Sequence, residues 1–173
     1  MASKDINLPT IDAYVDLCLL DGGSMIGETH YLHAGEPPKP FRLYNWAFLI
    51  QHPKHRRQVL WDLGMSPVSH ALKHAKVFFG PATSEFCSPG HFQDPSSQWD
   101  GRFFDLEIKT ETWETLPGPW MNFGAFDHAM DFFGDQSFWI IKAPGHMPGN
   151  LCACARLKSG EWVLLASDCC HSR

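Results

Sequence analysis

The stretch APGHMPGNLCACARLKSGEWVLLASDCCHSR, residues 143–173, decides the fold. It opens with a Pro-Gly-His-x-Pro-Gly turn around His146 and continues with two apolar runs, 151–157 and 161–168. The connector KSG between these runs is short enough to predict a β-hairpin. Asp168 ends the second run, so the pattern brings a histidine and a carboxylate to loops at strand ends, where functional residues concentrate.

Apolar runs bounded by Gly, Pro or Ser predict the remaining strands. The run at residues 13–23 should end at the pair Gly22 and Gly23. The runs at residues 45–53 and 57–64 should form a hairpin through the turn PKHR. Helical patterns are few, at residues 66–76 and 84–87. The expected strands cover residues 13–23, 45–53, 57–64, 75–81, 103–116 and 136–144.

Composition favours one globular domain over residues 1–173, because 44% hydrophobic residues can bury a sizeable core. The net charge of -5 and the scattered Lys and Arg residues argue against nucleic acid as a partner. No apolar run approaches the roughly 20 residues of a membrane helix, and the first residues show no signal peptide. We therefore expect a cytoplasmic protein with small-molecule partners and no membrane contact.

The six cysteines are too few for a secreted disulfide framework. Cys152 and Cys154 would share one face of a strand, where they could bind a soft metal or simply be buried, as free cysteines commonly are. A nucleophilic pair built from Cys169 or Cys170 with His171 or His146 is a weaker alternative, because nothing in the sequence indicates an activated thiol.

Four segments carry a family resemblance: NWAFLIQHP, RQVLWDLG, AKVFFGPATSEFCSPG and FFGDQSFWIIKAPGHMPGNLCACARLKSGEWVLLASDCCH. In this order they resemble the metallo-β-lactamase superfamily, in the lactonase-like branch that includes hydrolases of natural-product biosynthesis. The resemblance implies an α/β fold, a β-rich αββα sandwich with helices outside two sheets. It also implies a site for one or two zinc ions at one edge of the sheets.

The resemblance assigns roles to four residues. His146 matches the zinc-ligand histidine of the Pro-Gly-His turn, and Asp168 matches the carboxylate that bridges two metals or binds the second. Asp62 matches the aspartate that supports the metal loop. Asn150 stands where many relatives have a second histidine that is not a ligand.

The chain departs from the family pattern in its main ligand motif. His-x-His-x-Asp-His is absent, and the segment around residues 65–75 is much shorter than in relatives. The last metal histidine, expected downstream of Asp168, has no counterpart. The sequence therefore predicts an incomplete sandwich, shortened internally and truncated at its C-terminal end.

This incomplete ligand set limits the expected chemistry. A catalytic zinc uses three protein ligands and activates a water molecule. With His146 and Asp168 alone, zinc should be absent or substoichiometric. Hydrolysis of a lactone, ester or thioester by a metal-bound hydroxide should then be weak or lost. The alternatives are a non-catalytic binding or regulatory module and a shortened gene product that retains part of the fold.

Other histidines could complete the site. His70 and His74 fall one turn apart on the expected helix and could supply two further ligands, although such a pair more often lies on a solvated face. His91 and His128 are expected to be structural or solvated. Substitution of His52 and His55, in the hairpin turn, is expected to change neither metal binding nor hydrolysis. His171 lies too close to the terminus to carry a prediction.

Missing strand partners and outer helices would leave sheet edges and apolar faces uncovered, which favours self-association. The aromatic side chains expected to be poorly covered are those of Trp46, Trp61, Phe78, Phe79 and Trp162.

Overall fold

The computed structural model describes residues 7–33, 35–62, 75–97, 99 and 112–169. Within them, no helix combines the length and the apolar character needed to cross a membrane. The described part of the chain is β-rich, with two short α-helices and one 3-10 turn. Its elements are β1 (Asp16–Glu28), α1 (Thr29–Leu32), β2 (Pro40–His52), β3 (Arg57–Trp61), β4 (Lys76–Phe79), α2 (Thr83–Cys87), β5 (Thr112–Thr115), β6 (Met121–Phe123), β7 (Phe126–Asp131), β8 (Phe138–Lys142), β9 (Leu151–Arg156), β10 (Trp162–Leu165) and η3 (Ser167–Cys169).

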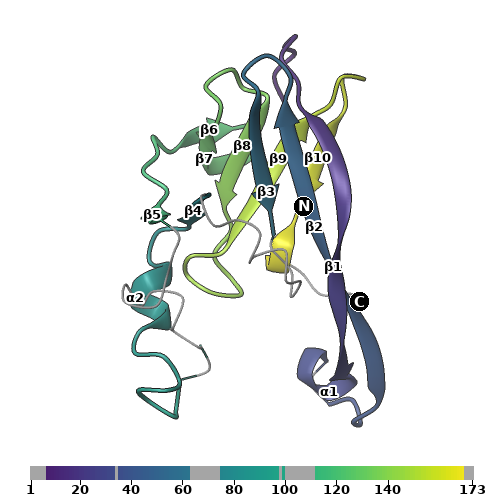
Figure 1. The fold of residues 1–173 in the computed structure, drawn as a ribbon, viewed down its shortest axis with the longest axis vertical. Coiled ribbons are helices and arrows are strands. Elements are labelled where there is room, and N and C mark those ends of the chain that lie inside the picture. The colour runs from purple at the N-terminus through teal and green to yellow at the C-terminus, as the bar shows by residue number, and fades with distance from the viewer. Residues whose placement is uncertain (1–6, 34, 63–74, 98, 100–111, 170–173) are drawn as a thin grey trace.

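Two antiparallel sheets face each other (Figure 1). One is three-stranded in the order β1-β2-β3, and the other is five-stranded in the order β10-β9-β8-β7-β6. A separate parallel pair joins β4 and β5. Both predicted hairpins, β2–β3 and β9–β10, are confirmed. The predicted helix at 84–87 is confirmed as α2, whereas most of the helix predicted at 66–76 lies outside the described residues.

The main core lies between the two sheets. From the three-stranded sheet, Ile50 is fully buried, and Leu17, Phe48 and Val59 pack beside it. The opposing sheet contributes alternate residues of β8 and β9, as expected for strands with one face toward a core. The buried members of this cluster are Val15, Ile50, Leu116, Met130, Phe133, Phe138, Ile140, Ala153, Ala155 and Leu165.

A second cluster covers the other face of the five-stranded sheet. Phe123 stacks on Trp139 with ring centroids 4.4 Å apart, and Leu8 packs against the cluster. Cys152 and Cys154 are buried here, and burial raises the pKa of Cys152 to about 12 and that of Cys154 to about 11. β8 and β9 are therefore buried on both faces, which explains why they read as continuous apolar runs.

The strand predicted to end at Gly22 and Gly23 instead continues to Glu28, so this boundary was wrong. The chain accommodates the two glycines as an irregularity between Asp21 and Ser24. A Cβ at Gly22 would lie 2.8 Å from the backbone oxygen of Asn45, and Gly23 has a φ of +92°. Glycine here permits a bulge inside a long strand rather than ending it.

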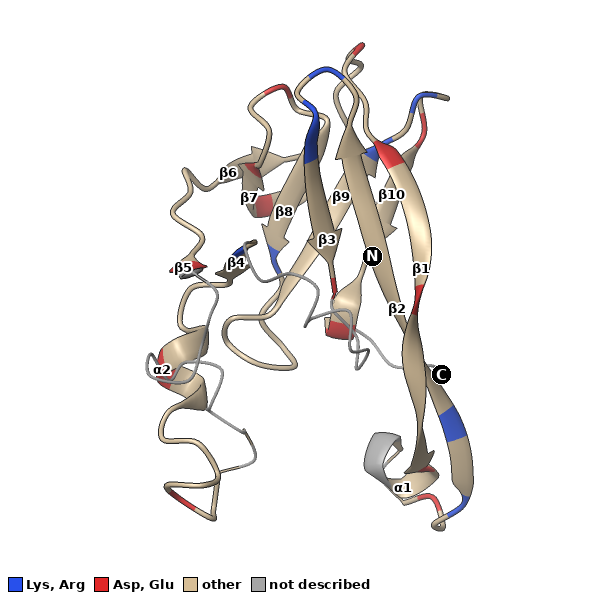
Figure 2. Ribbon diagram, in the orientation of Figure 1, with Lys and Arg blue, Asp and Glu red and all other residues tan. Residues whose placement is uncertain are grey.

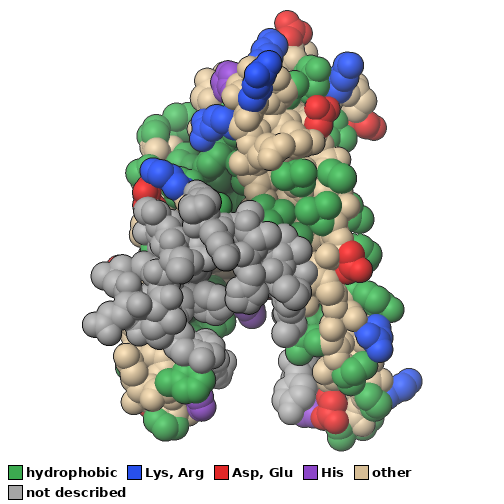
Figure 3. Space-filling view, in the orientation of Figure 1, with side chains coloured by type: hydrophobic (Ala, Val, Ile, Leu, Met, Phe, Trp, Pro, Cys, Tyr) green, Lys and Arg blue, Asp and Glu red, His purple; other side chains and the backbone are tan. Residues whose placement is uncertain are grey.

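The far half of the β1–β2 hairpin extends beyond β3 and the facing sheet (Figure 1). Figure 3 shows hydrophobic side chains gathered over this part of the molecule. Among the aromatic residues predicted to be poorly covered, Trp46 and Phe78 are exposed and the other three are half-buried. Basic and acidic residues lie at separate places on both sheets, with a short basic run at the turn between β2 and β3 (Figure 2). The exposed large side chains of the hairpin are Leu19, Met25, Ile26, Tyr44 and Trp46.

Candidate functional site

Three segments with predicted site residues meet at one end of the sandwich. β8 ends at Lys142 and β9 starts at Leu151, so the loop 143–150 with His146 lies at this end. β10 runs antiparallel to β9 and leads into η3, which contains Asp168. β3 points the same way as β8 (Figure 1), so Asp62, directly after β3, also lies at this end.

The His146 loop is closed by hydrogen bonds from both of its ends. The backbone N–H of Ala143 donates to the carbonyl of Asn150 at 3.0 Å. The side-chain amide of the buried Asn150 donates back to the carbonyl of Ala143, also at 3.0 Å. Asn150 thus takes a structural position in the loop, which fits its expected role as a residue that is not a ligand.

Two glycines let the loop of His146 approach the start of α2 and the residues just before it. A Cβ on Gly149 would collide with the side chain of Thr83, and a Cβ on Gly80 would collide with the carbonyl oxygen of Gly149. Thr83 is itself fixed, because its hydroxyl donates to the carbonyl of Gly80 at 2.7 Å. The Pro-Gly-His-x-Pro-Gly motif therefore specifies close packing of the loop as well as its turn.

His146 and Asp168 are both exposed. The imidazole of His146 lies against the indole of Trp99, with ring centroids 6.0 Å apart and an interplanar angle of 89°. Among the described residues, no group of three donor atoms converges at this end of the sandwich. His70 and His74 lie outside the described residues, so their part in the site stays a prediction.

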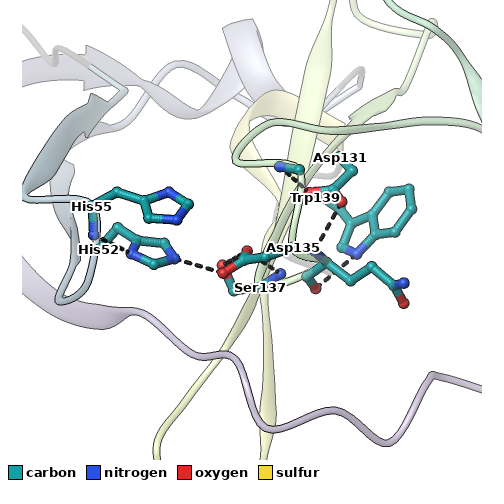
Figure 4. Close-up of polar contacts among 8 residues, drawn as sticks. His52, His55, Asp131, Asp135, Ser137 and Trp139 are labelled. Carbon is teal, nitrogen blue, oxygen red and sulfur yellow. Dashed lines mark hydrogen bonds and ion pairs between the residues drawn. The ribbon is translucent and has the colours of Figure 1, made fainter.

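A group of three donor atoms does converge at the opposite end of the sandwich. One donor atom each of His52, His55 and Asp135 lies within 4.8 Å of the others. His52 ends β2, His55 lies in the turn before β3, and Asp135 lies in the turn before β8 (Figure 4). The cluster links the two sheets, because Nε2 of His52 lies 2.7 Å from Oδ2 of Asp135.

The hydrogen bonds of this cluster define the tautomer of His52. The backbone N–H of His55 donates to Nδ1 of His52 at 3.1 Å, so Nδ1 carries no proton. Nε2 then carries the proton and donates it to Asp135. The rings of His52 and His55 also stack face to face, 4.0 Å between centroids. A metal ion at Nε2 would have to displace this proton, so the described geometry is that of a structural tie.

Asp135 is held in its charged form by the same network. Its Oδ1 accepts hydrogen bonds from the hydroxyl of Ser137 at 2.6 Å and from the backbone N–H of Ser137 at 3.1 Å. Burial disfavours the charged carboxylate, but the hydrogen bonds from Ser137 and His52 outweigh burial and lower the pKa of Asp135. Ser137 is fully buried and bonds to the carboxylate instead of to the histidine, so these residues do not form a nucleophilic triad.

The sequence reasoning did not single out this cluster. The signal in the sequence is the spacing of two histidines three residues apart, His52 and His55, which a tight turn alone also explains. Asp135 gave no signal, because its partner lies 83 residues away in the sequence.

Comparison with known proteins agrees with this fold. No family model matches the chain. A metallo-hydrolase, mfmC, of Annulohypoxylon moriforme is 51% identical over 98 residues, which cover 55% of this chain and 25% of that protein. The gamma-lactamase MBL2 of Gibberella moniliformis is 33% identical over 76 residues, or 42% of this chain and 28% of that protein. The chain thus spans about a quarter of the length of these relatives.

Solved structures share the fold at low sequence identity. An N-acyl homoserine lactone hydrolase, solved with its product bound at the catalytic metal center, matches with a TM-score of 0.60 and 8% identity. The match covers 89% of this chain and 75% of that one. The molecule therefore has the fold of metallo-β-lactamase-type lactonases. Together with the two sequence matches, this fold agrees with the expected resemblance to the metallo-β-lactamase superfamily and its lactonase-like branch.

Proposed function

We propose that the chain derives from a metal-dependent hydrolase of lactones, esters or thioesters, with His146 and Asp168 as its metal ligands. The observation that carries the proposal is the meeting of the His146 loop and the Asp168 turn at one end of the sandwich. The names of the relatives, a metallo-hydrolase and a gamma-lactamase, agree in reaction class. Zinc as the metal, a cytoplasmic location and a role in natural-product biosynthesis belong to the proposal and rest on the family resemblance.

The described donor set falls short of a complete catalytic centre. Imidazole and carboxylate are ligand types that zinc accepts, but a catalytic zinc needs three protein ligands. Because the resemblance assigns only His146 and Asp168 as ligands among the described residues, and no group of three donor atoms converges there, we propose low metal occupancy and weak hydrolysis for this chain alone. In the single domain of residues 1–173, His70 and His74 would have to supply the further ligands.

The test combines elemental analysis with an assay on an N-acyl homoserine lactone and a nitrophenyl thioester. Zinc should be substoichiometric in the purified chain, and His146→Ala or Asp168→Asn should remove both the residual zinc and any hydrolysis. His128→Ala, at an exposed position on β7, is the matched control and should change neither. Stoichiometric zinc that survives His146→Ala would contradict the ligand assignment.

A second candidate function is a non-catalytic binding or regulatory module. The exposed apolar side chains on the far half of the β1–β2 hairpin favour it, since large exposed apolar patches mark contact surfaces. Under this alternative the chain should associate with itself or with a protein partner whether or not metal is present. If the His146→Ala variant keeps this association, the association does not depend on the proposed metal site, as expected for a binding module.

A further inference from the structure

Two thiols from different elements meet beside the Asp168 turn. Cys152 is the second residue of β9, and Cys169 ends η3. The register of the β9–β10 hairpin pairs Leu165 with Ala153. The chain then turns back at η3, where the N–H of Cys169 donates to the carbonyl of Ala166 at 3.1 Å. This reversal packs η3 against β9 and places Cys169 close to Cys152, near enough for the thiol of Cys169 to add to the effect of burial in raising the pKa of Cys152.

The position of Cys169 is fixed by a second contact. The side-chain amide of Asn150 lies 3.6 Å from Sγ of Cys169. The same amide closes the His146 loop by donating to Ala143. The two thiols therefore meet at the junction between the loop of His146 and the turn of Asp168.

The two thiols differ in their access to solvent. Cys169 is exposed, whereas Cys152 is only 5% exposed. A reagent in solution can therefore reach Cys169 directly, but Cys152 can react only with a group that Cys169 already carries. This is the arrangement of an attacking thiol with a resolving thiol.

We propose that Cys152 and Cys169 form a modification site that closes to an intramolecular disulfide when the chain reacts with a low-molecular-weight disulfide of the glutathione class. In the first step the thiolate of Cys169 attacks one sulfur of oxidised glutathione and releases one glutathione thiolate. In the second step the buried thiol of Cys152, which its raised pKa keeps protonated at neutral pH, loses its proton as its sulfur attacks Sγ of Cys169, and the second glutathione leaves with that proton. Both cysteines are oxidised, one glutathione disulfide is reduced, and the two thiol protons end on the two glutathione molecules.

The new bond would tie η3 to the start of β9. Asp168 directly precedes Cys169, so the disulfide would restrict the backbone of a proposed metal ligand. The pair does not depend on the proposed hydrolase function, because the reaction needs only the two thiols and the reagent.

The test uses the full chain, first reduced and then incubated with oxidised glutathione. Trypsin without reductant should release fragments 143–156 and 159–173 as one cross-linked species, two hydrogens lighter than the sum of the fragments. Tandem mass spectrometry should locate the link at Cys152 and Cys169. Reduction should restore both separate fragments.

Four variants assign the link. Cys152→Ala and Cys169→Ala should each abolish it, whereas Cys154→Ala and Cys170→Ala should retain it. Cys169→Ala decides the matter even if the buried substitution Cys152→Ala impairs folding. A link from Cys154, a link that persists in Cys169→Ala, a vicinal Cys169–Cys170 bond, or a stable glutathione adduct without closure would each overturn the proposal.

Discussion

Nε2 of His52 lies 2.7 Å from Oδ2 of Asp135, and this contact joins the end of β2 to the turn before β8. The side chain of His52 is almost fully buried, and that of Asp135 is 25% exposed. Phe133 lies edge-on to the His52 ring at 5.0 Å, which closes the site from the core side. A polar contact of this kind fixes how the two sheets align, because the apolar core between them is not directional.

Removal of the Asp135 carboxylate should destabilise the fold. Asp135→Ala leaves the buried Nε2–H of His52 without its acceptor, and hydrogen bonds to charged groups contribute about 1.5 to 3 kcal/mol. We expect a loss of about that size in the free energy of unfolding, measured by urea denaturation. His55→Ala is the matched control, because it keeps the backbone N–H that donates to His52. Equal losses in the two variants would show that ring stacking, not the carboxylate, holds the turn.

The contribution of Asp135 to the free energy of unfolding should decrease as the pH falls into the acidic range. Its pKa in the folded chain is lowered, despite burial, by hydrogen bonds from Ser137 and His52. The stabilisation is therefore fully present above the unfolded value of about 3.9 and is lost as pH falls through the folded pKa. The difference in unfolding free energy between the unmodified chain and Asp135→Ala should shrink over this acidic range. A difference that stays constant down to the lowest pH at which the chain folds would contradict the assignment.

Gly149→Ala should displace the His146 loop. The added Cβ would collide with the Thr83 side chain, and overpacking of this kind costs about 1 to 3 kcal/mol. Because the His146 loop contacts Trp99, the change should also alter tryptophan fluorescence. Gly145→Ala, in the same loop, meets no atom within 4 Å and should leave both measurements nearly unchanged. Equal effects of the two substitutions would show that loop flexibility, rather than contact with Thr83, matters.

Local patterns were sufficient to predict most of the sheet framework. The runs that became β8, β9 and β10 combine apolar residues with turn signals at both ends, and both hairpins have short connectors. β6 and β7 were missed because Met121–Phe123 is very short and the residues of β7 include Asp127 and His128. Periodicity is weak evidence over so few residues.

The candidate metal site and the His52–Asp135 contact differ in how far they could be predicted. His146 and Asp168 lie within one hairpin-containing stretch, so their placement at one end followed from the motif and the strand directions. The contact between His52 and Asp135 depends on how two sheets pack, and nothing local to either residue encodes it. The closeness of Cys152 and Cys169 likewise depends on the reversal at η3, which the apolar pattern of residues 161–168 does not reveal.

The far half of the β1–β2 hairpin should mediate self-association. The register pairs Asp21 with Trp46 and Ser24 with Tyr44, so Trp46 and Tyr44 share the face that continues from the core. Tyr44 is 59% exposed, Trp46 is 48% exposed, and Ile26 on the same face is 61% exposed. β3 pairs with β2 only from Phe48 to His52, so among the described residues this half of the hairpin is a two-stranded ribbon without further strand partners.

We therefore expect the sedimentation coefficient of the purified chain to rise with protein concentration in analytical ultracentrifugation. The double substitution Ile26→Gln and Trp46→Gln should shift the chain toward the monomer, because it removes apolar surface that association would bury. Leu164→Gln is the matched control: it replaces a side chain that is 52% exposed on β10, in the other sheet, and should not change the association. A chain that stays monomeric at all concentrations would refute the prediction. An equal shift toward the monomer on Leu164→Gln would also refute it, because a general loss of apolar surface would then explain the result without any role for the hairpin.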